Sequence, residues 1–211
     1  MSLQIWLAFV LASAVLLVIP GPTVLALIGY AVGGTPLRAR QRTAMVAGVA
    51  LGDAAALTAS LAGLGGLLMA SAFWFTVVKW AGGIYLLYLA VRMLAAGMSI
   101  STLQPDAALA SARGLFGRTF LVTALNPKPI VFFVAFLPQF VQPGGDVARQ
   151  LWILGATFIA LSTLNATLYA CFAGTARRLL AAPRARRGFN LAGGTMLGGA
   201  GVWALLARRP G

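Results

Sequence analysis

Acidic side chains are almost absent from this chain of 211 residues. Asp53, Asp106 and Asp146 are its only acids, and it contains no Glu, no His and a single cysteine, Cys171. Without His, the chain has neither His-based acid–base triads nor His-ligated metal sites. One cysteine cannot form an intramolecular disulfide. We therefore expect no metal and no cofactor.

Charge of either sign is scarce, since 9% of the residues are charged and 60% are hydrophobic. A soluble domain carries about a quarter charged residues, because its surface faces water. This chain has too little charge to cover such a surface, so its composition predicts an integral membrane protein. The first residues lack the basic segment of a secretory signal peptide, and we expect the first apolar run to remain as a transmembrane helix.

Six apolar runs are long enough to cross a bilayer, which takes about 20 residues. They lie at about 3–30, 43–70, 75–96, 118–141, 150–174 and 189–207. The stretch 97–117 is polar, and Gln142 to Asp146 has the composition of a tight surface turn. The pattern predicts an all-α integral membrane protein with six transmembrane helices, forming a single transporter domain over residues 1–211.

The 16 Lys and Arg residues give a formal net charge of +13. Nucleic-acid binding would require a basic face on a soluble fold, whereas these cations lie in short loops between apolar runs, so we expect no nucleic-acid partner. They concentrate in the first, third and fifth loops, which the positive-inside rule places in the cytoplasm with both termini outside. Arg208 and Arg209, near the C-terminus, run against this orientation.

Three short motifs recur in order in the two halves of the chain. Pro20-Gly21-Pro22, Ala39-Arg40-Gln41 and Ala81-Gly82-Gly83 are matched 107, 109 and 111 residues later. The matches are Pro127-Lys128-Pro129, Ala148-Arg149-Gln150 and Ala192-Gly193-Gly194. Their collinearity predicts two repeats, at about 1–97 and 112–209. Because each repeat has three spans, the second must be inverted in the membrane, as in many secondary transporters.

Both proline motifs fall inside predicted spans, where proline removes a backbone donor and clashes with the preceding turn. Pro20, Gly21 and Pro22 should break the first span, and Asn126-Pro127-Lys128-Pro129 should break the fourth. Broken backbone in a bilayer is tolerated where it is buried in protein or lines a wet cavity. Simple kinks at packing sites are the alternative, but corresponding breaks in two repeats favour a transport site.

Asp53 is the only acid within a predicted span, which favours a functional role because an unpaired carboxylate is costly in lipid. Its structural alternative is an ion pair with Lys79 or Lys128, the only two lysines. Lys128 lies inside a broken helix and could meet a substrate carboxylate. Lys79 is close to a membrane interface, where its side chain reaches the headgroups.

Ser162, Asn165 and Tyr169 form one polar stripe on the fifth span. From the sequence, Asn165 could bind substrate or could bind a neighbouring helix. Two glycine pairs, Gly48 with Gly52 and Gly194 with Gly198, have the spacing of close helix packing, and we interpret them as structural.

The motifs are also specific in combination. In chain order they are Pro20-Gly21-Pro22, Gly48 to Asp53, Lys79-Trp80-Ala81-Gly82 with Tyr85-Leu86, Asn126-Pro127-Lys128 and Phe136-Leu137-Pro138-Gln139-Phe140. Together they resemble the LysE/RhtB family of amino-acid exporters. The resemblance implies efflux of amino acids or close derivatives, such as homoserine, threonine, lysine or arginine, through a bacterial inner membrane. It also implies coupling to protons and allows a homodimer, and it does not identify the substrate.

The residues and the resemblance lead to one hypothesis, a proton-linked exporter of small zwitterions. The helix N-terminus after Pro22 would receive the substrate carboxylate, assisted by Lys128, because free N–H groups and the helix dipole favour an anion. Asp53 would hold the ammonium or carry the proton. The cationic side chain of lysine would need a second acid, and no other acid lies in a predicted span, so we expect neutral substrates to be preferred over lysine. A channel or a structural membrane subunit is the alternative. An intramembrane enzyme is a weaker rival, since paired acids and metal-ligand spacings are missing.

Overall fold

In this computed structural model the described residues are 1–19, 21–32, 37–70, 111–142 and 144–182, with scattered positions between 77 and 202. The predicted third and sixth spans are described only at these scattered positions. Pro20, Lys79 and Gly194 also lie outside the described residues.

Helices make up all the regular structure in the described part of the chain, which confirms the predicted all-α class. They are α1 (Leu3–Val18), α2 (Pro22–Val32), α3 (Ala39–Ala70), α5 (Ala112–Ala124), α6 (Pro127–Ala135), the short 3₁₀ helix η3 (Leu137–Phe140) and α7 (Val147–Ala181). By length and composition, α3 and α7 can each cross a membrane. A third crossing is present if α1 and α2, which are bent by 52° at their junction, form one span.

Several predicted boundaries were wrong because hydropathy marks the part of a helix that lies in lipid, not its hydrogen-bonded ends. The starts expected at about 43, 118 and 150 are at Ala39, Ala112 and Val147. Capping residues set two of these starts: Ser111 Oγ accepts from the Gly114 N–H, and Asp146 Oδ1 accepts from the Arg149 N–H. The end expected at about 174 is close to the irregular backbone at Phe172, where the candidate membrane span of α7 ends, and the helix then continues beyond this kink to Ala181. The fourth predicted span is divided into α5, α6 and η3, and the break between α5 and α6 lies at the proline motif that predicts it.

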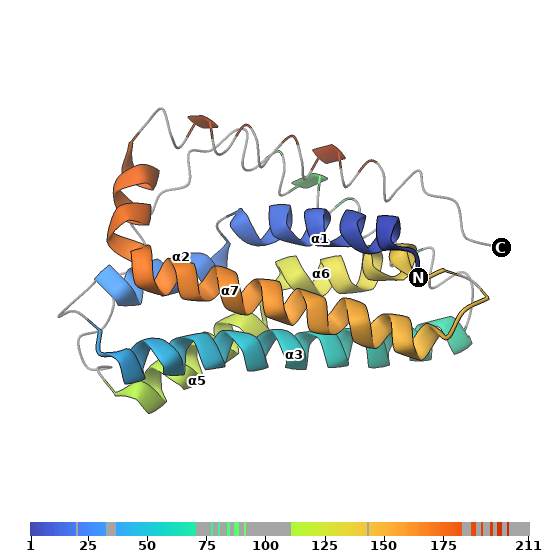
Figure 1. Ribbon diagram of the computed structural model, residues 1–211, viewed down its shortest axis with the longest axis horizontal. Helices are drawn as coiled ribbons and strands as arrows, with labels where there is room; N and C mark the ends of the chain where they lie inside the picture. The colour runs from blue at the N-terminus through green and yellow to red at the C-terminus, as the bar shows by residue number, and fades with distance from the viewer. Residues whose placement is uncertain are drawn as a thin grey trace.

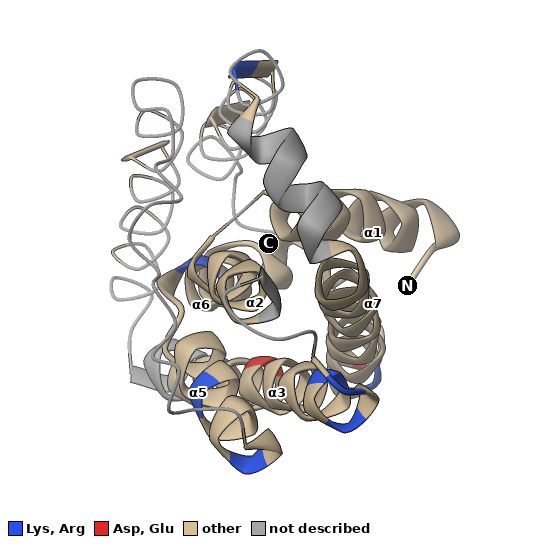
Figure 2. Ribbon diagram, turned by 90° about the vertical axis from the view of Figure 1, so that its left-hand side faces the viewer, with Lys and Arg blue, Asp and Glu red and all other residues tan. Residues whose placement is uncertain are grey.

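The helices run in two opposed sets (Figure 1). The chain passes along α1, α2 and α7 in one direction and along α3, α5 and α6 in the other. As a result, the starts of α3 and α5 lie on the left of Figure 1, the side on which α7 bends away from its main axis. We call this the basic end, because α3 and α5 bring five arginines to it: Arg38, Arg40, Arg42, Arg113 and Arg118. Figure 2 looks onto it. At the opposite end the Ser2 N–H donates to Gln142 Oε1 at 2.7 Å.

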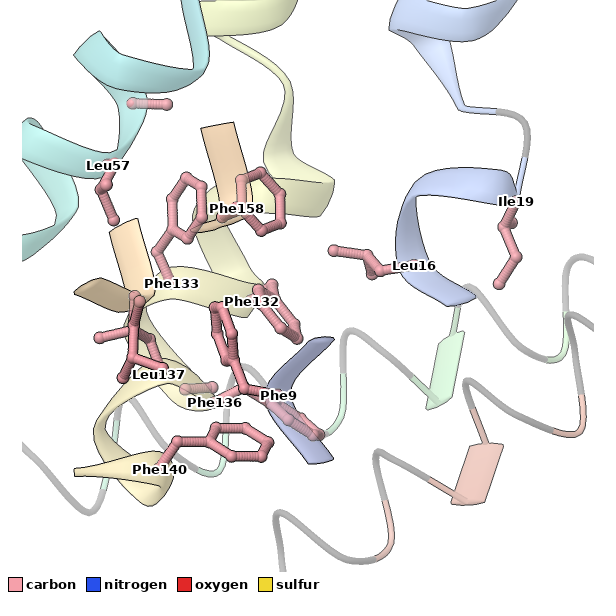
Figure 3. Close-up of a cluster of buried hydrophobic side chains, with 13 residues drawn as sticks. Phe9, Leu16, Ile19, Leu57, Phe132, Phe133, Phe136, Leu137, Phe140 and Phe158 are labelled. Atoms are coloured by element: carbon pink, nitrogen blue, oxygen red, sulfur yellow. The ribbon is translucent and has the colours of Figure 1, made fainter. Parts of the chain in front are cut away.

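A large apolar core surrounds α6 and η3, which lie away from the basic end in Figure 1, and Figure 3 shows its side chains. We call it the phenylalanine cluster, because six of its buried residues are Phe9, Phe132, Phe133, Phe136, Phe140 and Phe158. They come from α1, α6, η3, α7 and the residue between α6 and η3. The Phe133 and Phe158 rings meet edge to face at a centroid distance of 4.7 Å, a favoured aromatic geometry. The cluster thereby fixes α6 against α1 and α7.

A smaller apolar cluster lies nearer the basic end. Its buried members are Leu27, Met45, Val49, Leu115 and Ala166, and we call it the Met45 cluster. It joins α2, α3, α5 and α7. One apolar cluster therefore lies toward each end of the molecule, and polar residues lie between the two clusters.

Gly48 and Gly52 bring α3 into close contact with α5, as the spacing of the pair predicts. A Cβ atom at Gly48 would lie 2.6 Å from the Phe116 carbonyl oxygen, and one at Gly52 would lie 2.8 Å from that of Phe120. This proximity lets Thr119 Oγ1 reach the Met45 carbonyl oxygen at 3.1 Å. The pair is therefore structural, and it places Asp53, the next residue, at a tightly packed position.

Gly52→Ala should lower the free energy of unfolding by about 1–3 kcal/mol, because the new methyl group would press on backbone that cannot move aside. Gly63→Ala is the matched control on the same helix, since a Cβ atom there meets nothing within 4 Å. It should be neutral or stabilising by up to about 1 kcal/mol. Thermal unfolding in detergent measures both, and equal melting temperatures for the two variants would contradict this packing.

Candidate functional site

The first helix break exposes the carbonyl groups at the end of α1. The last bond of α1 runs from the Ile19 N–H to the Val15 carbonyl oxygen at 3.3 Å. Pro22 begins α2 and has no N–H with which to continue the helix. The carbonyls of Leu17, Val18 and Ile19 consequently lack the partners that an unbroken helix would supply.

Three side chains from the second half of the chain replace those partners. Asn165 Nδ2 donates to the Leu17 carbonyl oxygen at 3.1 Å, and the Tyr169 hydroxyl donates to that of Val18 at 3.1 Å. Lys128 Nζ donates to the Ile19 carbonyl oxygen at 2.5 Å. One residue of α6 and two residues of α7 thus satisfy three consecutive carbonyls of α1. The polar stripe on the fifth predicted span therefore faces the first break.

The second break, between α5 and α6, is capped locally. Asn126 Oδ1 accepts from the Lys128 N–H at 3.1 Å, and Pro127 and Pro129 have no N–H to offer. The α6 N-terminus therefore has few free donors. Asn126 also connects the two breaks, because its Nδ2 donates to Thr23 Oγ1 at 3.0 Å. Thr23 Oγ1 in turn lies 3.3 Å from Thr123 Oγ1.

The N-terminus of α2 differs from that of α6 because two of its first residues, Thr23 and Val24, keep N–H groups that neither a proline nor a local cap removes. The first intrahelical bond of α2 runs from the Leu25 N–H to the Gly21 carbonyl oxygen. The N–H groups of Thr23 and Val24 precede that bond, and by helix geometry they have no partner within the helix. The helix dipole adds partial positive charge at the same place. This N-terminus can therefore bind an anion.

Asp53 is the buried acid of the site, with 3% of its surface exposed. It lies on α3 and accepts a hydrogen bond from the Ser162 hydroxyl of α7. Asp53 and Lys128 attract one another electrostatically. Their hydrogen bonds nevertheless go to different groups, since Lys128 donates to the Ile19 carbonyl oxygen and Asp53 accepts from the Ser162 hydroxyl. The ion pair considered from the sequence is thus a longer-range attraction rather than a hydrogen-bonded pair.

A cavity of about 40 Å³ lies among these groups. Five of the predicted site residues line it: Gly21, Asp53, Asn126, Lys128 and Asn165. The volume is room for about three water molecules. Positive groups, from Lys128 and the start of α2, and the negative group of Asp53 thus border one small cavity between the two apolar clusters.

The other predicted site residues take positions next to the cavity or outside the described part. Pro22 and Pro127 are the first residues of α2 and α6 and do not line it. Pro20 is not among the described residues. Sequence reasoning missed Thr23, whose hydroxyl joins the two breaks, although its position directly after Pro-Gly-Pro was a usable signal. It noted Ser162 but did not assign it to Asp53.

The chain is similar to known efflux proteins along most of its length. Residues 14–208 match the family described as "LysE type translocator". The chain is 31% identical over 200 residues to the "Homoserine/homoserine lactone efflux protein" of Salmonella typhi, covering 93% of each chain. It is 30% identical over 139 residues to the "Leucine efflux protein" of Klebsiella pneumoniae, covering 65% of this chain and 63% of the relative. No solved structure matches significantly. The family suggested by the sequence motifs is confirmed.

Lys128→Met should destabilise the protein by about 3 kcal/mol, because it leaves Asp53 as a buried charge without its cation and the Ile19 carbonyl without its donor. Asp53→Asn should also destabilise it, by leaving Lys128 without its counter-charge. In the double variant the loss should be smaller than the sum of the two. Unfolding of all four proteins in detergent measures this coupling, and additivity within about 0.5 kcal/mol would show that the two charges act independently.

Proposed function

We propose that this chain, which belongs to the family of LysE type translocators, exports small amino acids or close derivatives from the bacterial cytoplasm across the inner membrane. One observation carries the proposal: a single cavity has Asp53 on its wall together with Lys128 and the N-terminus of α2. An amino acid brings an ammonium and a carboxylate, and each needs a partner when it leaves water. The cavity offers one partner for each.

The carboxylate binds at the N-terminus of α2, where the N–H groups of Thr23 and Val24 precede the first helical bond. The corresponding position of α6 is a poorer anion site, because Asn126 occupies the Lys128 N–H and two prolines lack theirs. The ammonium binds Asp53. Lys128 contributes a second positive charge. A substrate carboxylate beside Lys128 competes with the Ile19 carbonyl oxygen for the ammonium group of Lys128. Substrate binding thereby loosens one of the three contacts that hold the end of α1.

The proposed architecture has six spans arranged as two inverted repeats, within one domain. The opposed directions of α1–α2 and α5–α6, and of α3 and α7, support it. A second support is the contact between Asp53 and Ser162, which are 109 residues apart. That is also the offset of the Ala-Arg-Gln motifs that begin α3 and α7. Two equivalent residues that touch each other are expected on the axis relating the repeats, so this contact supports a position of Asp53 at the proposed repeat interface, where transporter sites occur.

The basic end faces the cytoplasm in this proposal, as the positive-inside rule requires for five arginines near helix starts. The start of α1 then faces the opposite side of the membrane. A homodimer, which the family resemblance allows, stays a prediction.

Proton coupling through Asp53 completes the proposed mechanism, since a carboxylate in the bilayer that meets both a hydroxyl and a substrate ammonium can alternate between proton and substrate. The protein acts as a carrier and not as an enzyme. A channel or structural subunit is the second candidate, and substrate-dependent counterflow in liposomes separates them. A carrier exchanges labelled homoserine against an opposed excess, whereas a channel or a scaffold does not.

Asp53→Asn should leave the protein inserted but reduce coupled export by about a hundredfold, because a buried cation then loses its carboxylate. The residual transport should no longer depend on pH. Asp146→Asn is the control: that residue caps α7 at the surface, and an asparagine caps equally well. Efflux in liposomes across a range of pH measures both variants. Wild-type export with an unchanged pH profile for Asp53→Asn would make the residue structural.

Neutral, small or hydroxylated amino acids should compete for export better than lysine or arginine, because Asp53 is the only acid lining the described cavity. A cationic side chain would need a second carboxylate once it left water. The substrates named for the relatives above, homoserine, homoserine lactone and leucine, carry no charged side chain, which supports this preference. Competition against labelled homoserine efflux tests it, and stronger competition by lysine than by any neutral amino acid would overturn it.

A further inference from the structure

A second cavity, of about 350 Å³, lies between α3 and α7 at the basic end. Among the described residues its lining includes Arg42, Thr43 and Val46 from α3 and Thr167, Ala170 and Cys171 from α7. Figure 2, which looks onto this end, shows α3 and α7 side by side. The volume is within the range of small-molecule sites, roughly 300–1,000 Å³. The central cavity is about a tenth of that size, so only the outer one already has room for an amino acid.

The two cavities are neighbours along the same pair of helices. On α3 the outer cavity reaches Val46 and the central one begins at Val49. On α7 the central cavity includes Ala166 and the outer one includes Thr167. Three residues of helix rise about 4.5 Å, so less than one turn separates them.

The Met45 cluster fills that separation. Leu27, Val49 and Ala166 belong to it and line the central cavity, while Val46 packs against it and lines the outer one. Among the described residues it has five buried members, against thirteen in the phenylalanine cluster on the other side of the central cavity. Opening the Met45 cluster would therefore expose less apolar surface to water than opening the phenylalanine cluster. The unbranched Met45 side chain also repacks readily. The thinner barrier therefore lies between the two cavities.

We propose that the outer cavity is a vestibule on the cytoplasmic side, in which Arg42 binds the carboxylate of the amino acid before it passes the Met45 cluster. Arg42 is half-buried and is the charged residue among those described in the lining. A guanidinium pairs with a carboxylate through two parallel hydrogen bonds. The N-terminus of α2 and Lys128 offer the same carboxylate its next partners deeper in the protein. This inference rests on the proposed export of amino acids.

Arg42→Gln should raise the KM for homoserine uptake into inside-out vesicles about tenfold, since a hydrogen-bonded charged partner is lost. The kcat should change by less than about twofold, because the central cavity is untouched. Arg42→Lys should keep most of the affinity. Arg40→Gln is the matched control, an exposed arginine on the same turn that does not line the vestibule. If both glutamine variants transport with the wild-type KM, Arg42 does not bind substrate, while export by the wild type still stands.

Cys171 provides a direct probe, because it is the only cysteine in the chain, is exposed and lines the vestibule. A membrane-impermeant maleimide should label it in inside-out vesicles and not in right-side-out ones. Homoserine should slow the labelling, and 3-amino-1-propanol, which lacks the carboxylate, should not. Arg42→Gln should remove the protection. Equal protection by both compounds, labelling from the opposite side, or protection by anionic lipid in place of homoserine would each overturn the proposal.

Discussion

Proline supplies no backbone N–H, and the core of a bilayer has no water to replace a missing hydrogen bond. Every carbonyl that a broken helix exposes in lipid must therefore find a donor within the protein. At the end of α1 those donors are Asn165, Tyr169 and Lys128, all from the second half of the chain. The need to satisfy three carbonyls thus ties α6 and α7 to α1. It also brings the second helix break against the first, where Asn126 reaches Thr23.

The same arrangement explains why charge can be kept inside this protein. Asp53 and Lys128 are nearly buried, at 3% and 8% exposure, and each would be costly alone. Each has a hydrogen-bond partner, and both line one small cavity, where their opposite charges attract one another. Members of both apolar clusters, such as Leu16 and Val49, also line that cavity. A substrate that carries one positive and one negative group can exchange with these partners without leaving a buried charge unpaired, which is what a carrier for zwitterions requires.

Much of this could be predicted from the sequence, because its strongest signals are local. Proline inside an apolar run predicts a helix break wherever the rest of the chain lies, and both breaks are present. The spacing of Gly48 and Gly52 predicted close packing for a similar reason. Five of the eight predicted site residues line one cavity, because the two helix breaks that contain most of them lie against each other. Their role in binding stays a proposal.

What the sequence could not provide depends on contacts between distant residues. Nothing local indicates that Lys128 donates to the Ile19 carbonyl or that Ser162 is the partner of Asp53, because those pairs form only when the two halves pack. Helix ends were misplaced for a different reason, since capping by Ser111 and Asp146 lies outside the apolar runs. The vestibule was missed because Arg42 looks like any other arginine of a cytoplasmic loop until α7 lies beside it.

The most direct test of the account is an experimental structure of the protein determined with homoserine bound. We expect the carboxylate of homoserine about 3 Å from the N–H groups of Thr23 and Val24, and its ammonium beside Asp53, in an enlarged central cavity. Homoserine bound only at a position remote from both helix breaks would contradict the central claim that the junction of the two breaks is the substrate site.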